Sequence, residues 1–203
     1  MSLRIEQDGR LCRITLAAPD KRNVLDEKAC RDLFHEMTDA ALDEATGAIL
    51  LEADGPVFCA GTECDDPDLF SIGTRIGKPV IAAVQGVALS GGLALVANAH
   101  VVVAAKGTSF GLTDIREGKW QEAAFRAVAS ALGDRRALEL GLTGRVFATP
   151  EALDWGLVHH VAPAFELDDR ATEIGTALAN ASSSAVRSAL TRASMYRSGP
   201  AHY

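Results

Sequence analysis

The pattern of apolar and polar residues near the start of the chain predicts two strands and a helix. Apolar and polar residues alternate over 3–7 and 10–16, and the Asp-Gly pair between them is a two-residue turn signal, so these segments predict a β-hairpin. After Asp26, apolar residues recur every three or four positions. This spacing predicts an amphipathic helix that Asp26 caps and that ends near 45–47.

Several short runs further along are apolar at every position. Such runs are typical of strands buried on both faces, and they cover 48–53, 80–84 and 101–105. The glycine-rich residues 86–92 predict a turn, and the apolar segment 93–99 predicts a short buried helix. Strands that alternate with helices in this way predict an α/β fold.

Helical patterns dominate the second half of the chain. The predicted helices are 121–132, 134–142, 149–155, 166–180 and 184–196. The segment LVHHVAP at 157–163 predicts one more strand, which Pro163 ends. No linker or low-complexity stretch divides the sequence, so residues 1–203 are predicted to form a single domain with helices toward its C-terminus.

Composition supports a globular protein and argues against other classes. With 203 residues, 48% apolar and 23% charged, the chain has enough apolar side chains for one buried core. No Asp, Glu, Lys or Arg lies between Lys78 and Lys106, but proline, glycines and polar residues interrupt that stretch, so no membrane span is predicted. The net charge of -7, with scattered basic residues, argues against nucleic acid as a partner. The first residues show no signal or transit pattern, which predicts a cytoplasmic protein.

The chain contains four cysteines, which are Cys12, Cys30, Cys59 and Cys64. They form no Cys-x-x-Cys pair and have no cluster of histidines near them, so the sequence predicts neither a metal site nor a disulfide framework. We therefore expect all four to be reduced thiols.

Two loops combine small residues with glycine next to buried elements. They are Cys59-Ala60-Gly61 and Ser90-Gly91-Gly92. Small residues leave backbone N–H groups accessible, and an N–H at the start of a helix favours an oxygen that gains negative charge. Glycines also serve tight turns and close packing, so the residues alone leave both interpretations open.

The sequence resembles the crotonase superfamily, also called the enoyl-CoA hydratase/isomerase superfamily. The resemblance is carried by PVFCAG at 56–61, KPVIAAVQGVALSGGLALVANAHVVVAA at 78–105, SFGLTDIREG at 109–118 and LTGRVFATPEALDWGLVHHV at 142–161, with weaker support from RITLAAPDKRNVLD at 13–26. It implies a crotonase-like spiral of repeated strand-strand-helix turns. It also implies a helical region at about 164–203 that is shorter than usual.

The resemblance also implies a substrate class and an assembly. The substrate is an acyl-CoA or acyl-carrier thioester of the kind found in fatty acid metabolism, and coenzyme A belongs to that substrate, so no separate cofactor is expected. The assembly is a homotrimer or a dimer of trimers.

By position in these motifs, the family's oxyanion hole falls on the backbone N–H groups of Ala60 and Gly91. The adjacent Cys59, Gly61 and Gly92 are expected to line the thioester site. Two N–H groups that hold the thioester oxygen make the α-proton more acidic and stabilise the enolate that forms when it leaves, and one such donor contributes on the order of 3 kcal/mol.

The acid/base positions differ from those of hydratases in this family. Hydratases carry two glutamates, and the corresponding positions here are Ala94 and Asp114. Addition of water needs one group that deprotonates water and one that protonates carbon, and a methyl group does neither. The resemblance therefore favours an isomerase-type enzyme in which Asp114 moves the proton, although aspartate is also a common turn residue. Glu117 and Glu63 are candidate auxiliary acids.

Two regions are shorter than is usual in the family, and we expect this to open the acyl pocket. They are 62–77 and the end of the chain after 196. Trp120 and Trp155 are expected to be core or lid aromatics. Two other functions stay open: a hydrolase of thioesters or carbon-carbon bonds, and a non-catalytic accessory subunit that keeps the fold.

Overall fold

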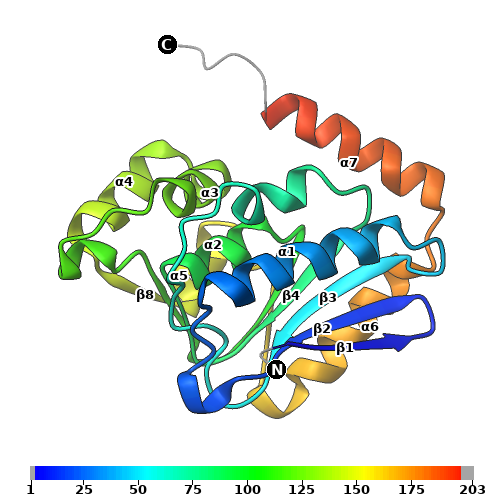
Figure 1. Ribbon diagram of the computed structural model, residues 1–203, viewed down its shortest axis with the longest axis horizontal. Coiled ribbons are helices and arrows are strands. Elements are labelled where there is room, and N and C mark those ends of the chain that lie inside the picture. The colour runs from blue at the N-terminus through cyan, green and yellow to red at the C-terminus, as the bar shows by residue number, and fades with distance from the viewer. Residues whose placement is uncertain (1–2, 198–203) are drawn as a thin grey trace.

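The computed structural model describes residues 3–197, with side chains as far as 193. Within these residues the main sheet has six strands in the order β1-β2-β3-β4-β6-β9. Figure 1 shows β1 to β4 side by side. The strands are β1 (Leu3–Asp8), β2 (Leu11–Leu16), β3 (Ala48–Ala53), β4 (Val80–Val84), β6 (Val101–Ala105) and β9 (His160–Ala162). β1 and β2 form the predicted antiparallel hairpin, and the other neighbours pair in parallel. The apolar runs are therefore confirmed as strands.

A second sheet, which the sequence did not predict, links the segments that carry the candidate site. In the described chain it consists of β5 (Val87–Leu89), β7 (Ser109–Gly111) and β8 (Val146–Ala148). β5 is parallel to β7, and β8 is antiparallel to it. Strands of three residues are too short to show a hydrophobic period, which is why 86–92 was expected to be only a turn.

Helices pack on both faces of the main sheet (Figure 1). The α-helices are α1 (Glu27–Leu42), α2 (Gly91–Asn98), α3 (Glu122–Leu132), α4 (Asp134–Thr143), α5 (Thr149–Asp154), α6 (Leu167–Ala179) and α7 (Ser183–Arg197). The 3-10 helices are η1 (Pro19–Lys21), η2 (Leu69–Thr74), η3 (Asp114–Glu117) and η4 (Ala164–Glu166). The predicted helices are all present, and Asp26 Oδ1 caps α1 by accepting the Ala29 N–H at 2.7 Å. However, α1 ends at Leu42 and not near 45–47 as predicted. The last residues of the expected C-terminal region, 198–203, lie outside the described residues.

Each face of the main sheet buries its own apolar cluster. On one face, Ile14 packs in a cluster with Leu33 of α1 and with residues of α2. On the other face, Leu11 and Leu50 pack in a cluster with Leu167 and other residues of α6. This two-sided burial explains why the central strands are apolar at nearly every position. Among residues 3–197, no helix is both long enough and apolar enough to cross a membrane.

Asn23 joins three chain segments next to the strand ends. Its side chain is buried, and its φ of 52° lies in the left-handed region that asparagine tolerates better than most residues. Asn23 Oδ1 accepts the Ala18 N–H at 2.9 Å, and Nδ2 donates to the carbonyl oxygens of Asp54 at 3.0 Å and Val57 at 2.8 Å. Because Val57 leads into the loop at 59–62, these hydrogen bonds fix where that loop begins.

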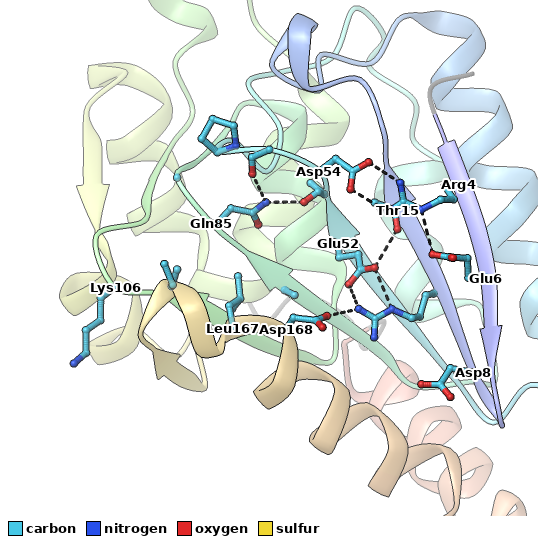
Figure 2. A pocket seen from close by; sticks show the side chains of 18 of the residues that line it. Arg4, Glu6, Asp8, Thr15, Glu52, Asp54, Gln85, Lys106, Leu167 and Asp168 are labelled. Carbon is cyan, nitrogen blue, oxygen red and sulfur yellow. Dashed lines mark hydrogen bonds and ion pairs between the residues drawn. The ribbon is translucent and has the colours of Figure 1, made fainter.

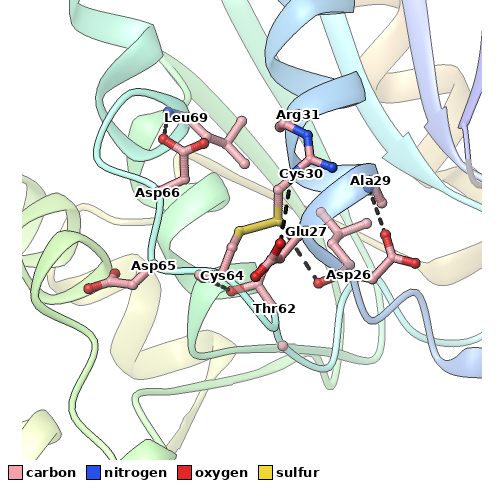
Figure 3. The surroundings of a disulfide bond; sticks show 12 residues. Asp26, Glu27, Ala29, Cys30, Arg31, Thr62, Cys64, Asp65, Asp66 and Leu69 are labelled. Carbon is pink, nitrogen blue, oxygen red and sulfur yellow. Dashed lines mark hydrogen bonds and ion pairs between the residues drawn. A yellow bond between two sulfur atoms is a disulfide. The ribbon is translucent and has the colours of Figure 1, made fainter.

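The structure corrects the expectation that all cysteines are reduced. A disulfide joins Cys30 of α1 to Cys64 of the loop that follows 59–62 (Figure 3). The two residues are 34 positions apart, and no local spacing motif connects them, so the pair is visible only in the fold. Cys12 and Cys59 are free and buried, and burial raises the pKa of the Cys59 thiol to about 12.

We expect a dithiol reductant to lower the thermal stability of the native protein. A cross-link between distant positions restricts the unfolded chain, and its loss typically costs about 2–4 kcal/mol. Thermal unfolding with and without dithiothreitol measures the change, and a Cys30→Ser/Cys64→Ser double variant is the control that should respond little. Equal melting temperatures of the wild type in both conditions, or four titratable thiols in the unfolded, unreduced chain, would contradict this expectation.

Candidate active site

The two glycine-containing loops lie side by side at the ends of the strands. The Cys59 N–H donates to the Val87 carbonyl oxygen at 3.2 Å, and the Leu89 N–H donates to the Cys59 carbonyl oxygen at 3.0 Å. A Cβ on Gly92 would lie 2.5 Å from the Cys59 carbonyl oxygen, so this close approach requires glycine. The loop at 59–62 therefore lies against the start of α2.

The predicted oxyanion donor Ala60 is already engaged. Its backbone N–H donates to the Arg22 carbonyl oxygen at 3.1 Å, which holds the loop against the turn after η1. An N–H that makes such a bond is not free to bind a substrate oxygen. The candidate donor in this loop is therefore a different residue.

Thr62 takes the place of Ala60 as the candidate donor. The Leu25 N–H donates to the Gly61 carbonyl oxygen at 3.1 Å, and the Glu63 N–H donates to the Leu25 carbonyl oxygen at 2.8 Å. In such a bridge the N–H of the residue between the two points to the other side. Within residues 3–197 the Thr62 N–H makes no hydrogen bond, so it is free to bind a ligand.

Gly91 lies directly against Thr62. A Cβ on Gly91 would lie 2.1 Å from Thr62 Oγ1 and 2.5 Å from Thr62 Cγ2. Gly91 is the first residue of α2, so its N–H has no partner inside the helix, and it makes no other hydrogen bond in the described part of the chain. Thr62 and Gly91, which lie against each other in the fold, thus both offer unpaired N–H groups. The N–H of Gly91 also lies at the positive end of the α2 dipole.

Asp114 begins η3 and is tied to the same loops. The Ser90 N–H donates to the Gly111 carbonyl oxygen at 2.8 Å, and the hydroxyl groups of Ser90 and Thr113 are 3.3 Å apart. Because Ser90 precedes Gly91 and Thr113 precedes Asp114, these contacts hold the carboxylate segment beside the start of α2.

Asp114 lines a narrow cavity of about 10 Å³. The other lining residues are Leu112, Ile115, Trp120, Gln121, Phe125 and Gly141. Gln121 Nε2 donates to the Thr62 carbonyl oxygen at 3.2 Å, so the cavity wall is bonded to the loop that carries the candidate donor. The aromatic rings of Trp120 and Phe125 lie in the wall beside Asp114 and leave little space in this cavity.

Ala94 lies one turn after Ser90 on α2 and is fully buried. Its N–H donates to the Ser90 carbonyl oxygen at 3.1 Å, and its carbonyl oxygen accepts from Asn98 Nδ2 at 3.1 Å. Its methyl group belongs to the apolar cluster that also contains residues of α1. This position therefore contributes no group that exchanges protons.

The two candidate auxiliary acids lie away from the cavity wall. Glu117 forms an ion pair with Lys119 at 2.9 Å, and its side chain is 71% exposed. Glu63 is also exposed, and neither residue lines the cavity beside Asp114. Among the residues that the structure describes, no group of three or more His, Cys, Asp or Glu is placed to hold a metal ion.

Two residues of this neighbourhood were not singled out from the sequence. Thr62 is identified only by the hydrogen-bond pattern of its loop, because the residue type itself gives no signal. Gln121 belongs to no motif, and its Oε1 atom is buried with no hydrogen-bond partner in the described part of the chain. Gln121 links the two parts of the site, since it bonds to the Thr62 carbonyl oxygen and lines the cavity beside Asp114.

A much larger groove of about 990 Å³ lies along the face of the main sheet that α6 partly covers (Figure 2). Most of its charged side chains pair with one another. Arg13 Nη2 lies 2.7 Å from Glu52 Oε2 and also contacts Asp168, and Arg4 Nη1 lies 2.7 Å from Asp54 Oδ2. No residue of the candidate site lines this groove, so we do not assign the chemistry to it.

Comparison with known sequences identifies a family. The family model described as enoyl-CoA hydratase/isomerase matches residues 63–198. The mevalonyl-coenzyme A hydratase sidH of Aspergillus fumigatus is 31% identical over 191 residues, which cover 86% of this chain and 71% of that protein. The probable enoyl-CoA hydratase echA8 of Mycobacterium tuberculosis is 30% identical over 200 residues, which cover 91% of this chain and 78% of that protein.

Solved structures show the same architecture. The enoyl-CoA hydratase of Bacillus anthracis superimposes with a TM-score of 0.88 at 26% identity, covering 96% of this chain and 83% of that one. The enoyl-CoA hydratase EchA16_2 of Mycobacterium paratuberculosis gives a TM-score of 0.87 at 26% identity, covering 97% and 88%.

Proposed function

Since the chain belongs to the enoyl-CoA hydratase/isomerase family, also called the crotonase family, we propose that it is an enzyme that forms an enolate from an acyl-CoA thioester. The observation that carries this proposal is the pair of unpaired backbone N–H groups on Thr62 and Gly91 beside the segment of Asp114. These groups stabilise an oxygen, and the carboxylate moves a proton.

The oxyanion hole consists of the N–H groups of Thr62 and Gly91, with Cys59, Gly61 and Gly92 in the loops around it. The thioester oxygen accepts both hydrogen bonds, and its negative charge grows as the α-proton leaves. Donors that are already oriented stabilise that charge without reorganisation, and each contributes on the order of 3 kcal/mol.

Asp114 is the proton shuttle. Its carboxylate removes the α-proton, the C–H electron pair passes into the enolate, and the same carboxyl group returns the proton to another carbon of the conjugated system. Isomerisation of this kind needs one acid/base group. Because Ala94 offers no second carboxylate, the site favours isomerase-type chemistry.

Acyl-CoA thioesters, or acyl-carrier thioesters, are the substrates we propose. Coenzyme A is part of the substrate in this scheme, and no further cofactor is needed for a proton transfer. The proposed assembly is a homotrimer or a dimer of trimers. The side chains of Leu138 and Leu142 on α4 are apolar and exposed, and such residues favour association between subunits.

A non-catalytic accessory subunit is the second candidate function. Two observations favour it: the missing carboxylate at Ala94 and the narrowness of the cavity beside Asp114. In this case the fold would be kept for assembly, and the free N–H groups would bind no reacting thioester.

Product analysis distinguishes the two functions. The protein is incubated with 2-enoyl-CoA and 3-enoyl-CoA esters, and the products are separated and weighed by mass spectrometry. The proposal predicts interconversion of the two esters without a change in mass. Release of free coenzyme A would indicate a hydrolase, and no turnover together with no acyl-CoA binding would indicate the accessory subunit.

A further inference from the structure

The cavity beside Asp114 limits what can bind there. Its volume of about 10 Å³ is close to the room that a single water molecule needs. In the proposed function, on which this inference rests, Asp114 reaches the proton on the α-carbon. We place the acyl carbons that follow the α-carbon beside Asp114, where this narrow cavity leaves little room for them.

Trp120 lies in the wall of the cavity, and three contacts hold its ring in place. The ring centroid lies 5.0 Å from that of Phe125, and Trp120 Nε1 donates to Glu122 Oε2 at 3.0 Å. The ring also lies over Gly141 of α4, where a Cβ would be 3.0 Å from Trp120 Cζ3. These three contacts restrict the rotation of the indole, so its ring forms a fixed part of the cavity lining.

The loop that carries the candidate donor also holds the segment that carries the tryptophan. Gln121 Nε2 donates to the Thr62 carbonyl oxygen, and both carboxylate oxygens of Asp65 accept backbone N–H groups of α3, from Ala123 and Ala124, at 3.0 Å each. Thr62 and Asp65 belong to the same short loop (Figure 3). The contact between this loop and the start of α3 therefore fixes the position of the cavity wall.

The outer side of Trp120 meets solvent, because the residue is 44% exposed. Removal of the indole would thus widen the cavity toward the solvent, where a longer chain could extend. We propose that Trp120 is a specificity-determining residue that restricts the acyl group to a short chain.

Trp120→Ala tests this inference. The readout is deuterium incorporation at the α-carbon of butyryl-CoA and octanoyl-CoA in D₂O, expressed as the ratio of kcat/KM for the long ester to that for the short one. A single methylene too many in a closed pocket changes such a rate by about 10- to 200-fold. We expect the wild type to prefer butyryl-CoA, and the ratio to rise by at least about 10-fold in Trp120→Ala.

Trp155→Ala is the matched control. Trp155 packs on Phe147 at 4.9 Å between ring centroids and lines no part of the cavity, so its loss should leave the ratio unchanged. Trp120→Leu provides the same test with a smaller loss of packing, should the alanine variant not fold. An unchanged ratio in a folded Trp120 variant, or a wild type that accepts both esters equally, overturns the inference. Failure of the wild type and the variants to exchange either ester overturns the proposed function itself.

Discussion

The Asp114→Asn variant is expected to lose α-proton exchange by at least about 100-fold, because an amide does not accept the proton that a carboxylate accepts. Asparagine has nearly the same shape as aspartate, so the start of η3 should be preserved. The measurement is the rate of deuterium incorporation into butyryl-CoA in D₂O, together with the binding constant of the ester. We expect binding to change much less than the exchange rate.

Two further variants show whether the loss of α-proton exchange is caused specifically by removal of the Asp114 carboxylate. Glu117→Gln removes an exposed acid three residues away that lines no part of the cavity, and it should exchange at close to the wild-type rate. Asp114→Glu keeps a carboxylate with a longer reach, and it should retain more activity than Asp114→Asn. Wild-type exchange by Asp114→Asn would remove Asp114 from the mechanism.

Gly91→Ala is expected to lower the exchange rate by about 100-fold or more, comparable to the loss of one oxyanion-hole donor. The added Cβ would lie 2.1 Å from Thr62 Oγ1, so the two residues that carry the free N–H groups must move apart. Backbone strain is not the reason, because Gly91 lacks the positive φ that disfavours other residues. Exchange kinetics and a thermal unfolding curve together separate this effect from unfolding.

Control variants make the steric explanation testable. Gly77→Ala adds a methyl group that would meet only Arg187 at 3.9 Å, so it should exchange normally. The double variant Gly91→Ala/Thr62→Gly removes the side-chain atoms that cause the clash, and it should regain part of the lost activity. If Gly91→Ala exchanges within a few-fold of the wild type, the hole does not lie between these two residues.

Much of the fold could be predicted because its central elements are long and regular. The apolar runs at 48–53, 80–84 and 101–105 became parallel strands, and the helix after Asp26 begins where its cap indicated. The matched structures confirm the α/β crotonase fold that the motifs implied. The second sheet could not be predicted, since its three-residue strands depend on pairing between distant segments.

The candidate site was predictable only in part. Its loops, Gly91 and Asp114 followed from motif positions, which depend on local sequence. Thr62 could not be preferred to Ala60 without knowing that the Ala60 N–H already binds the Arg22 carbonyl oxygen. The narrow cavity and the Cys30–Cys64 bond arise from contacts between residues far apart in the chain, and composition and spacing do not reveal such contacts.

The central claim is that this chain stabilises an enolate of an acyl thioester, and a saturated ester tests it most directly. Butyryl-CoA has no double bond to hydrate or to move, so any exchange of its α-proton reports enolate formation alone. We predict that the wild-type protein incorporates deuterium from D₂O at the α-carbon. Mass spectrometry should show that the mass of the ester increases faster with the protein than in buffer without it. An unchanged mass after long incubation with saturating, bound butyryl-CoA would contradict the account.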